Sequence, residues 1–127
     1  MEERATPPVQ IAAFQAEYER LNRVVYAGAL PPFPGVVLLD TLDVFSMTRT
    51  RGAGAWRRLE PFLLSKHVAG DLLLEAIRHE VAHVAAMFLD EHEGHGAAWL
   101  SHARRVGASG EATLDAGHPL REAWPGA

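Results

Sequence analysis

Residues 72–89 read LLLEAIRHEVAHVAAMFL, and His79-Glu80-Val81-Ala82-His83 within them is an H-E-x-x-H motif. The length of this apolar run and its helix-forming residues predict an α-helix. Residues four apart on a helix return to nearly the same face, about 6 Å further along the axis. His79 and His83 are therefore placed to bind one ion, and the rest of the fold is expected to be built around this helix.

The motif predicts a zinc site with a general base beside it. Two imidazoles at positions i and i+4 converge on the Zn–N distance of about 2.0–2.1 Å without bending the helix. Glu80 lies about 100° around the helix from His79, so its carboxylate stands beside the ion and can take a proton from a water that the ion activates. The alternative is a pair of core histidines. The metal site is favoured because the opposite side of the helix is apolar: Leu74, Ile77, Val81, Ala85 and Phe88.

A catalytic zinc usually has three protein ligands and one open position, so the motif needs a third ligand from elsewhere. The chain has no cysteine, which leaves His, Asp and Glu. The downstream candidates are His92, His95, His102, Glu91 and Glu93. We prefer His95 because Gly96 follows it at the expected start of a helix, where glycine allows close backbone approach. His92 is expected to be a solvated loop residue, and His102 to lie on a helix surface.

Length, composition and charge limit the class of protein. A chain of 127 residues with 48% apolar residues fits one domain with one core. A net charge of −4 argues against a strongly electropositive nucleic-acid binder. Charged residues stand at the N-terminus where a signal peptide would be apolar, and no apolar run reaches the roughly 18 residues of a membrane span. We therefore expect a cytoplasmic protein that does not enter a membrane.

The remaining elements follow from hydrophobic periodicity and from Gly and Pro. Thr6-Pro7 resembles an N-cap followed by proline at the first helical position, and this helix should end by Gly28. The other expected elements are strands at residues 36–39, 44–50 and 56–64, a helix starting at Gly70-Asp71 and ending near residue 89, and a helix at residues 97–106. Three strands in succession predict a three-stranded antiparallel meander, which makes the fold class α+β.

Two further features concern the surface and the C-terminal end. Arginines gather at the ends of the last two expected strands, either as a small basic patch or as a charged edge that prevents edge-to-edge pairing: Arg49, Arg51, Arg57 and Arg58. Residues 108–127 are rich in Gly, Ala and Pro, and we expect them to form a loosely ordered tail.

Several short motifs occur in the order of a known family across residues 18–107. They are Asn22 with Tyr26-Ala27-Gly28-Ala29-Leu30-Pro31, Thr48-Arg49-Thr50-Arg51-Gly52, Leu63-Leu64-Ser65, His79-Glu80-Val81-Ala82-His83, and Gly94-His95-Gly96 with Trp99. The chain resembles the SprT-like metallopeptidase domain, a family that includes bacterial SprT proteins and the DNA-protein crosslink protease Spartan. H-E-x-x-H alone is shared by many zincins, but its combination with His-Gly about a dozen residues later is much more specific.

The resemblance implies a zincin-like fold with zinc on His79, His83 and His95 and with Glu80 as catalytic base. It also implies a SprT-like domain at residues 1–107. Bacterial SprT proteins commonly carry a cysteine zinc ribbon after this domain, and Spartan uses a further zinc-containing module to hold DNA. Residues 108–127 contain no cysteine and so no such ribbon.

Three hypotheses of function follow. The first is a zinc-dependent endopeptidase that cleaves protein or peptide substrates. The second is a DNA-associated protease that acts on DNA-bound or crosslinked proteins, with nucleic acid held by the four arginines. The third is a non-catalytic binding module in which His95 or Glu80 closes the zinc site and no position for water stays open.

Overall fold

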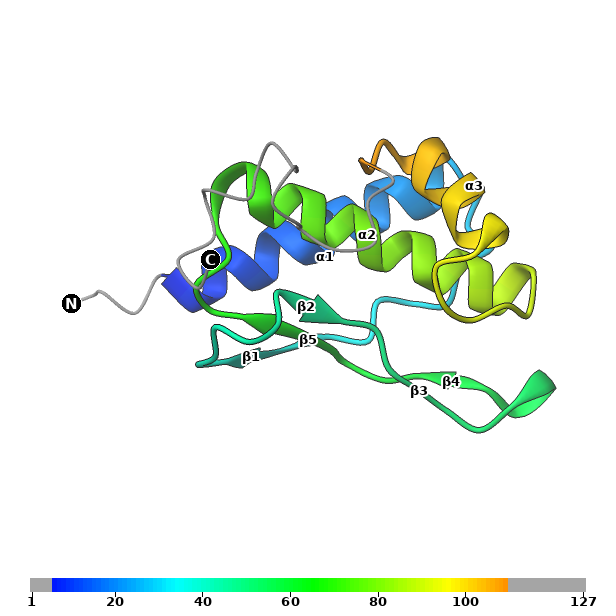
Figure 1. Ribbon diagram of the computed structural model, residues 1–127, viewed down its shortest axis with the longest axis horizontal. Coiled ribbons are helices and arrows are strands. Elements are labelled where there is room, and N and C mark those ends of the chain that lie inside the picture. The colour runs from blue at the N-terminus through cyan, green and yellow to red at the C-terminus, as the bar shows by residue number, and fades with distance from the viewer. Residues whose placement is uncertain (1–5, 110–127) are drawn as a thin grey trace.

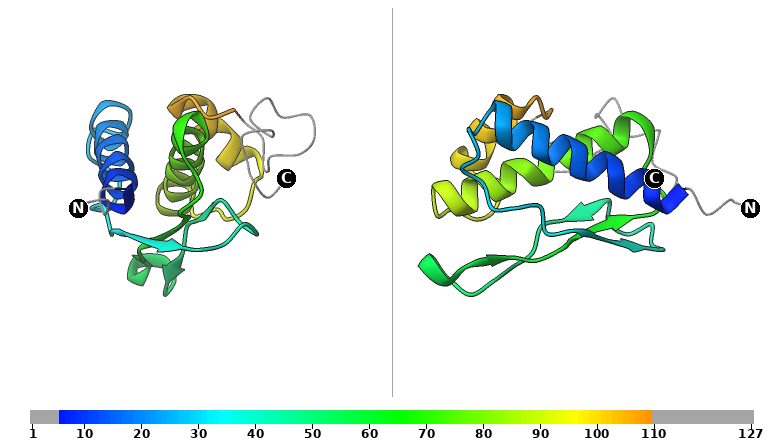
Figure 2. Two further views of the ribbon diagram at one scale, coloured as in Figure 1. Left: turned by 90° about the vertical axis from the view of Figure 1, so that its left-hand side faces the viewer. Right: turned by 180° about the vertical axis from the view of Figure 1, so that it is seen from behind.

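The computed structural model describes residues 6–109, which form three α-helices and two small sheets. The helices are α1 (Thr6–Val24), α2 (Gly70–Leu89) and α3 (Ala97–Val106). α1 and α2 lie side by side over one face of the sheet, and α3 packs on α2 near its C-terminal end (Figures 1 and 2). The predicted α+β class is confirmed. No helix in the described part of the chain is both long and apolar enough to cross a membrane.

The larger sheet has three strands in the order β1 (Val36–Leu39), β5 (Phe62–Ser65) and β2 (Ser46–Met47). β1 runs parallel to β5, whereas β2 runs antiparallel to it. The predicted antiparallel meander is therefore wrong, because β5 separates two strands that were expected to be neighbours. β5 is the most buried of the three strands, and the central position pairs both of its edges.

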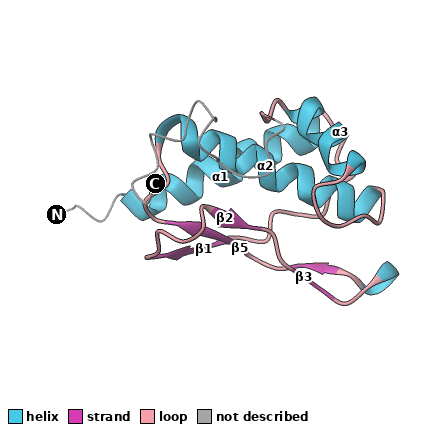
Figure 3. Ribbon diagram, in the orientation of Figure 1, coloured by secondary structure: helices cyan, strands magenta, loops and turns pink. Residues whose placement is uncertain are grey.

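The smaller sheet is a hairpin of β3 (Thr50–Arg51) and β4 (Arg58–Leu59), with a short 3-10 helix, η2 (Gly54–Trp56), near its tip. It extends away from the larger sheet beneath the C-terminal end of α2 (Figure 3). Two strands predicted as continuous are thus divided. Pro61 separates β4 from β5, as expected for a residue that cannot donate to a ladder.

Aromatic side chains fasten α1 to the sheet. Phe14 stacks on Phe62 with ring centroids 4.7 Å apart, and Tyr18 tilts against the same ring at 5.9 Å. All three side chains are completely buried.

α2 forms the centre of the core, although Leu74, which was expected to pack inward, is 37% exposed. The core therefore extends from the sheet through α2 to both neighbouring helices.

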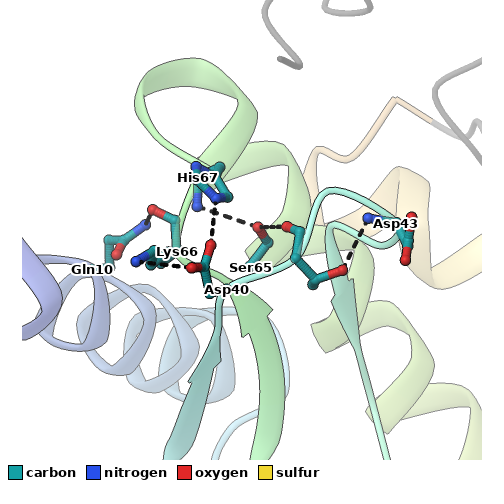
Figure 4. A network of polar contacts seen from close by, with 7 residues as sticks. Gln10, Asp40, Asp43, Ser65, Lys66 and His67 are labelled. Carbon is teal, nitrogen blue, oxygen red and sulfur yellow. Dashed lines mark hydrogen bonds and ion pairs between the residues drawn. The ribbon is translucent and has the colours of Figure 1, made fainter. Parts of the chain in front are cut away.

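A polar network fixes the turn between β5 and α2 (Figure 4). Gln10 of α1 donates from Nε2 to the backbone oxygens of Lys66, at 3.1 Å, and of Val68, at 2.5 Å. The His67 ring contacts the Asp40 carboxylate at 2.9 Å, and this partner lowers the pKa of Asp40. The turn therefore sets where α2 begins, and with it the position of every residue along that helix.

The first turn of α2 differs in detail from the expectation. The N-cap is Ala69, which offers no side-chain hydrogen bond, and Asp71 lies inside the first turn instead of capping it. A carboxylate there still faces the positive end of the helix dipole. The bounds of α2 and α3 agree with the predicted ranges.

Candidate metal centre

Three imidazoles converge at one point between α2 and the loop that precedes α3. We call them the histidine cluster: His79 and His83 from α2, and His95 from the loop. The Nε2 atom of His95 lies 3.0 Å from Nε2 of His83 and 3.2 Å from Nε2 of His79. The structure thus brings together the three residues that the sequence selected as ligands.

The spacing of these nitrogens fits a tetrahedral metal site. Zn–N bonds of about 2.0–2.1 Å at tetrahedral angles place ligand nitrogens roughly 3.3–3.4 Å apart. The two measured separations are 3.0 and 3.2 Å. A neutral imidazole has one donor and one acceptor nitrogen, so three Nε2 atoms facing one another cannot all be satisfied by hydrogen bonds. A cation that accepts their lone pairs resolves this conflict, and the cluster is therefore suited to hold a metal ion.

The protonation state of the cluster also suits a metal. Burial lowers the pKa of His79 to about 4, and the neighbouring His95 acts in the same direction. Burial likewise lowers the pKa of His83 to about 4, against the opposing effect of the Glu80 carboxylate. Both imidazoles are therefore neutral at pH 7, which is the form that binds metals.

Trp99 packs against the rings of the histidine cluster, a role that the sequence did not reveal. Its side chain is 1% exposed, and its indole Nε1 donates to the backbone oxygen of His79 at 3.3 Å. The ring centroid lies 4.9 Å from that of His79 and 4.8 Å from that of His95. Trp99 follows His95 by four residues, and this spacing was the available signal.

The loop that carries His95 has a defined backbone. The His92 amide donates to the Ala86 oxygen at 3.0 Å, and Glu91 takes a positive φ of 52°. A Cβ on Gly96 would stand 2.8 Å from Nε2 of His92, so glycine permits the close approach of this ring. His92 itself is exposed, as expected, and lies outside the histidine cluster.

His102 is not on the helix surface, and that prediction is wrong. Its side chain is only 4% exposed, with Nδ1 2.8 Å from the Tyr26 hydroxyl and Nε2 2.7 Å from the Asp90 carboxylate. A carboxylate only accepts, so in the neutral ring Nε2 donates to Asp90 and Nδ1 accepts from Tyr26. This chain of contacts joins the ends of α1 and α2 to α3. Asp90 is also the first residue of the loop that leads to His95.

Glu80 lies on the side of α2 that faces β2. Its side chain is 2% exposed, and it accepts hydrogen bonds from Ser46 Oγ at 2.6 Å and from Thr48 Oγ1 at 2.5 Å. Its oxygens are not part of the histidine cluster. Glu80 is nevertheless close enough to affect the pKa of His83. The arrangement is a carboxylate beside the candidate metal position and not on it.

The four arginines are mostly engaged within the molecule. Arg49 donates to the Pro61 oxygen at 3.0 Å, and Arg51 pairs with Glu60 at 3.1 Å. A second ion pair, between Arg57 of the hairpin and Glu93 of the loop, is also 3.1 Å long. Arg58 donates to a backbone oxygen of its neighbour at 3.4 Å. These contacts agree with a charged edge, and nucleic-acid binding stays a prediction.

Comparison with known proteins places the chain in a family. The model of the SprT-like family matches residues 35–118, which is more than half of the chain and includes the whole histidine cluster and Glu80. Searches of curated proteins and of solved structures found no match. The resemblance at Asn22 lies before the matched range, and there the side chain closes a turn by bonding both backbone groups of Leu30. By the family match, the chain belongs to the SprT-like family.

Proposed function

We propose that this chain is a zinc-dependent endopeptidase in which Glu80 is the general base. The observation that carries the proposal is the convergence of three imidazoles beside a buried carboxylate from the same helix. His79, His83 and His95 would hold the ion. When bound, zinc lowers the pKa of a water molecule toward about 7 and polarises the scissile carbonyl.

The buried Glu80 carboxylate, which affects the pKa of His83, supports the assignment of Glu80 as the base. Its carboxylate would accept a proton from the attacking water and then deliver it to the nitrogen of the leaving amine. Both oxygens are already oriented by hydroxyl donors, so little reorganisation accompanies the reaction. Trp99 would keep two ligand rings in place by packing against His79 and His95.

The edge position of β2, which pairs with β5 alone among the described strands, supports an extended peptide as substrate. β2 is an edge strand of its sheet, and it contacts α2 at Glu80. An extended peptide can pair with such an edge through main-chain hydrogen bonds. A segment of unfolded protein bound there would pass beside the histidine cluster, which favours an endopeptidase that acts on unstructured chains.

The ligand count favours this function over a closed, non-catalytic zinc module. A structural zinc site has four protein ligands. Within the described residues, the one group of suitable side chains contains three histidines and does not include Glu80. Three ligands from the described residues would leave a fourth position for water, as in a catalytic zinc site.

Substitution of the base tests the proposal. Glu80→Gln should retain zinc but cleave casein, an unstructured protein, about a hundred- to ten-thousand-fold more slowly, because the amide cannot accept the proton. Glu91→Gln, a matched change in the exposed loop, should cleave at the wild-type rate. Removal of zinc with EDTA should stop cleavage, and added zinc should restore it. Wild-type rates in Glu80→Gln would refute the mechanism.

A further inference from the structure

We propose that Ser46 and Thr48 are positioning residues that hold the Glu80 carboxylate in its reactive orientation. The inference rests on the proposed function, because it assigns these hydroxyls a part in the same reaction. Ser46 donates to Oε2 of Glu80 and Thr48 donates to Oε1, at 2.6 and 2.5 Å. Each carboxylate oxygen therefore has its own hydroxyl donor.

β2 and the residue that follows it place both hydroxyls on one side. Side chains two apart on an extended chain point the same way, and the residue between them points the other way. Ser46 and Thr48 face Glu80, whereas Met47 between them is 44% exposed. β2 is an edge strand among the described strands, so the segment that would guide a peptide substrate also orients the base.

The chemistry of the contacts fits a base that has to stay available. A carboxylate has about four lone-pair sites, and two hydroxyl donors leave the others free for a water. Bonds of this kind, from hydroxyl to carboxylate, are short and strong. They restrain the flexible side chain of Glu80, which is 2% exposed and has no ion pair within the described part of the chain. A small displacement of a catalytic group is costly to rate.

Kinetics of hydroxyl-deleted variants test the assignment. Thr48→Val and Ser46→Ala should each lower kcat about tenfold, with KM and zinc content unchanged. Thr48→Ser should recover most of the rate because it returns the hydroxyl. Thr50→Val is the matched control, since the Thr50 hydroxyl bonds Arg57 and not Glu80. A wild-type kcat in the Ser46→Ala, Thr48→Val double variant would overturn the proposal.

A measurement that needs no activity separates this inference from the proposed function. In the metal-free protein, Thr48→Val should lower the urea midpoint when Glu80 is present and change it little in a Glu80→Met background. Equal shifts in both backgrounds would overturn the inference even if cleavage is observed. If the wild type shows no zinc-dependent cleavage, the proposed function fails, and unequal shifts would show that the contact itself is nevertheless real.

Discussion

The Tyr26 side chain, His102 and Asp90 form a hydrogen-bond network, and removal of the Tyr26 hydroxyl should measurably destabilise the fold. Tyr26→Phe keeps the ring and its packing but leaves Nδ1 of His102 without a donor, in a side chain that is 4% exposed. A buried polar atom left unpaired costs about 1–3 kcal/mol. Asp90→Asn should cost less, about 0.5–1 kcal/mol, because water can reach a side chain that is 48% exposed.

Urea unfolding checks both values. For a small domain, a loss of about 1–3 kcal/mol lowers the urea midpoint by roughly 1 M. Tyr26→Phe combined with His102→Leu should cost less than the sum of the single changes, because the double variant removes both the Tyr26 hydroxyl and the buried ring, and water can reach the remaining Asp90 carboxylate. Two results would refute a stabilising role for the Tyr26–His102–Asp90 network. One is a Tyr26→Phe midpoint within about 0.2 M of wild type, and the other is a double variant whose loss of stability equals the sum of the two single losses.

Two further predictions concern pH and the hairpin. Burial lowers the pKa of His79 and His83 from 6.5 to about 4, so between these values the unfolded metal-free chain binds more protons than the folded one. Urea midpoints of the metal-free protein should therefore be highest above pH 6.5 and fall toward pH 4. An NMR titration in which the His79 and His83 imidazoles each show a pKa near 6.5 would contradict this prediction. Gly52→Ala should cost about 1–3 kcal/mol in urea unfolding, because φ is +79° and the new Cβ would stand 2.7 Å from the Trp56 oxygen. Gly28→Ala has a similar φ of +82° but no contact within 4 Å, so a loss as large as that of Gly52→Ala would argue against the clash.

Local periodicity explains what the sequence could predict. The bounds of α2 and α3 follow from repeats of three and four residues, and the pairing of His79 with His83 follows from helix geometry alone. His95 was chosen for the glycine that follows it, but the close approach at Gly96 is that of the His92 ring and not of the histidine cluster. Each of these features could be predicted because the residues that indicate it lie close together in the sequence.

Contacts between distant segments explain most of what was missed. The position of β5 between β1 and β2 depends on which strand is most buried, and neighbouring residues do not encode this. The hydroxyls that bond Glu80 are more than thirty residues before it in the chain. His102 is different, because it falls on the apolar stripe of α3 with Trp99, Ala103 and Val106. A histidine at such a position should have been expected to be buried.

Metal analysis of the purified protein tests the central claim most directly. Wild-type protein and His92→Ala should each carry about one zinc per chain by mass spectrometry, because His92 is exposed and outside the cluster. His95→Ala should lose the zinc while keeping its helical circular dichroism. Stoichiometric zinc in His95→Ala, or a wild-type protein that binds none, would contradict a metal centre made by His79, His83 and His95.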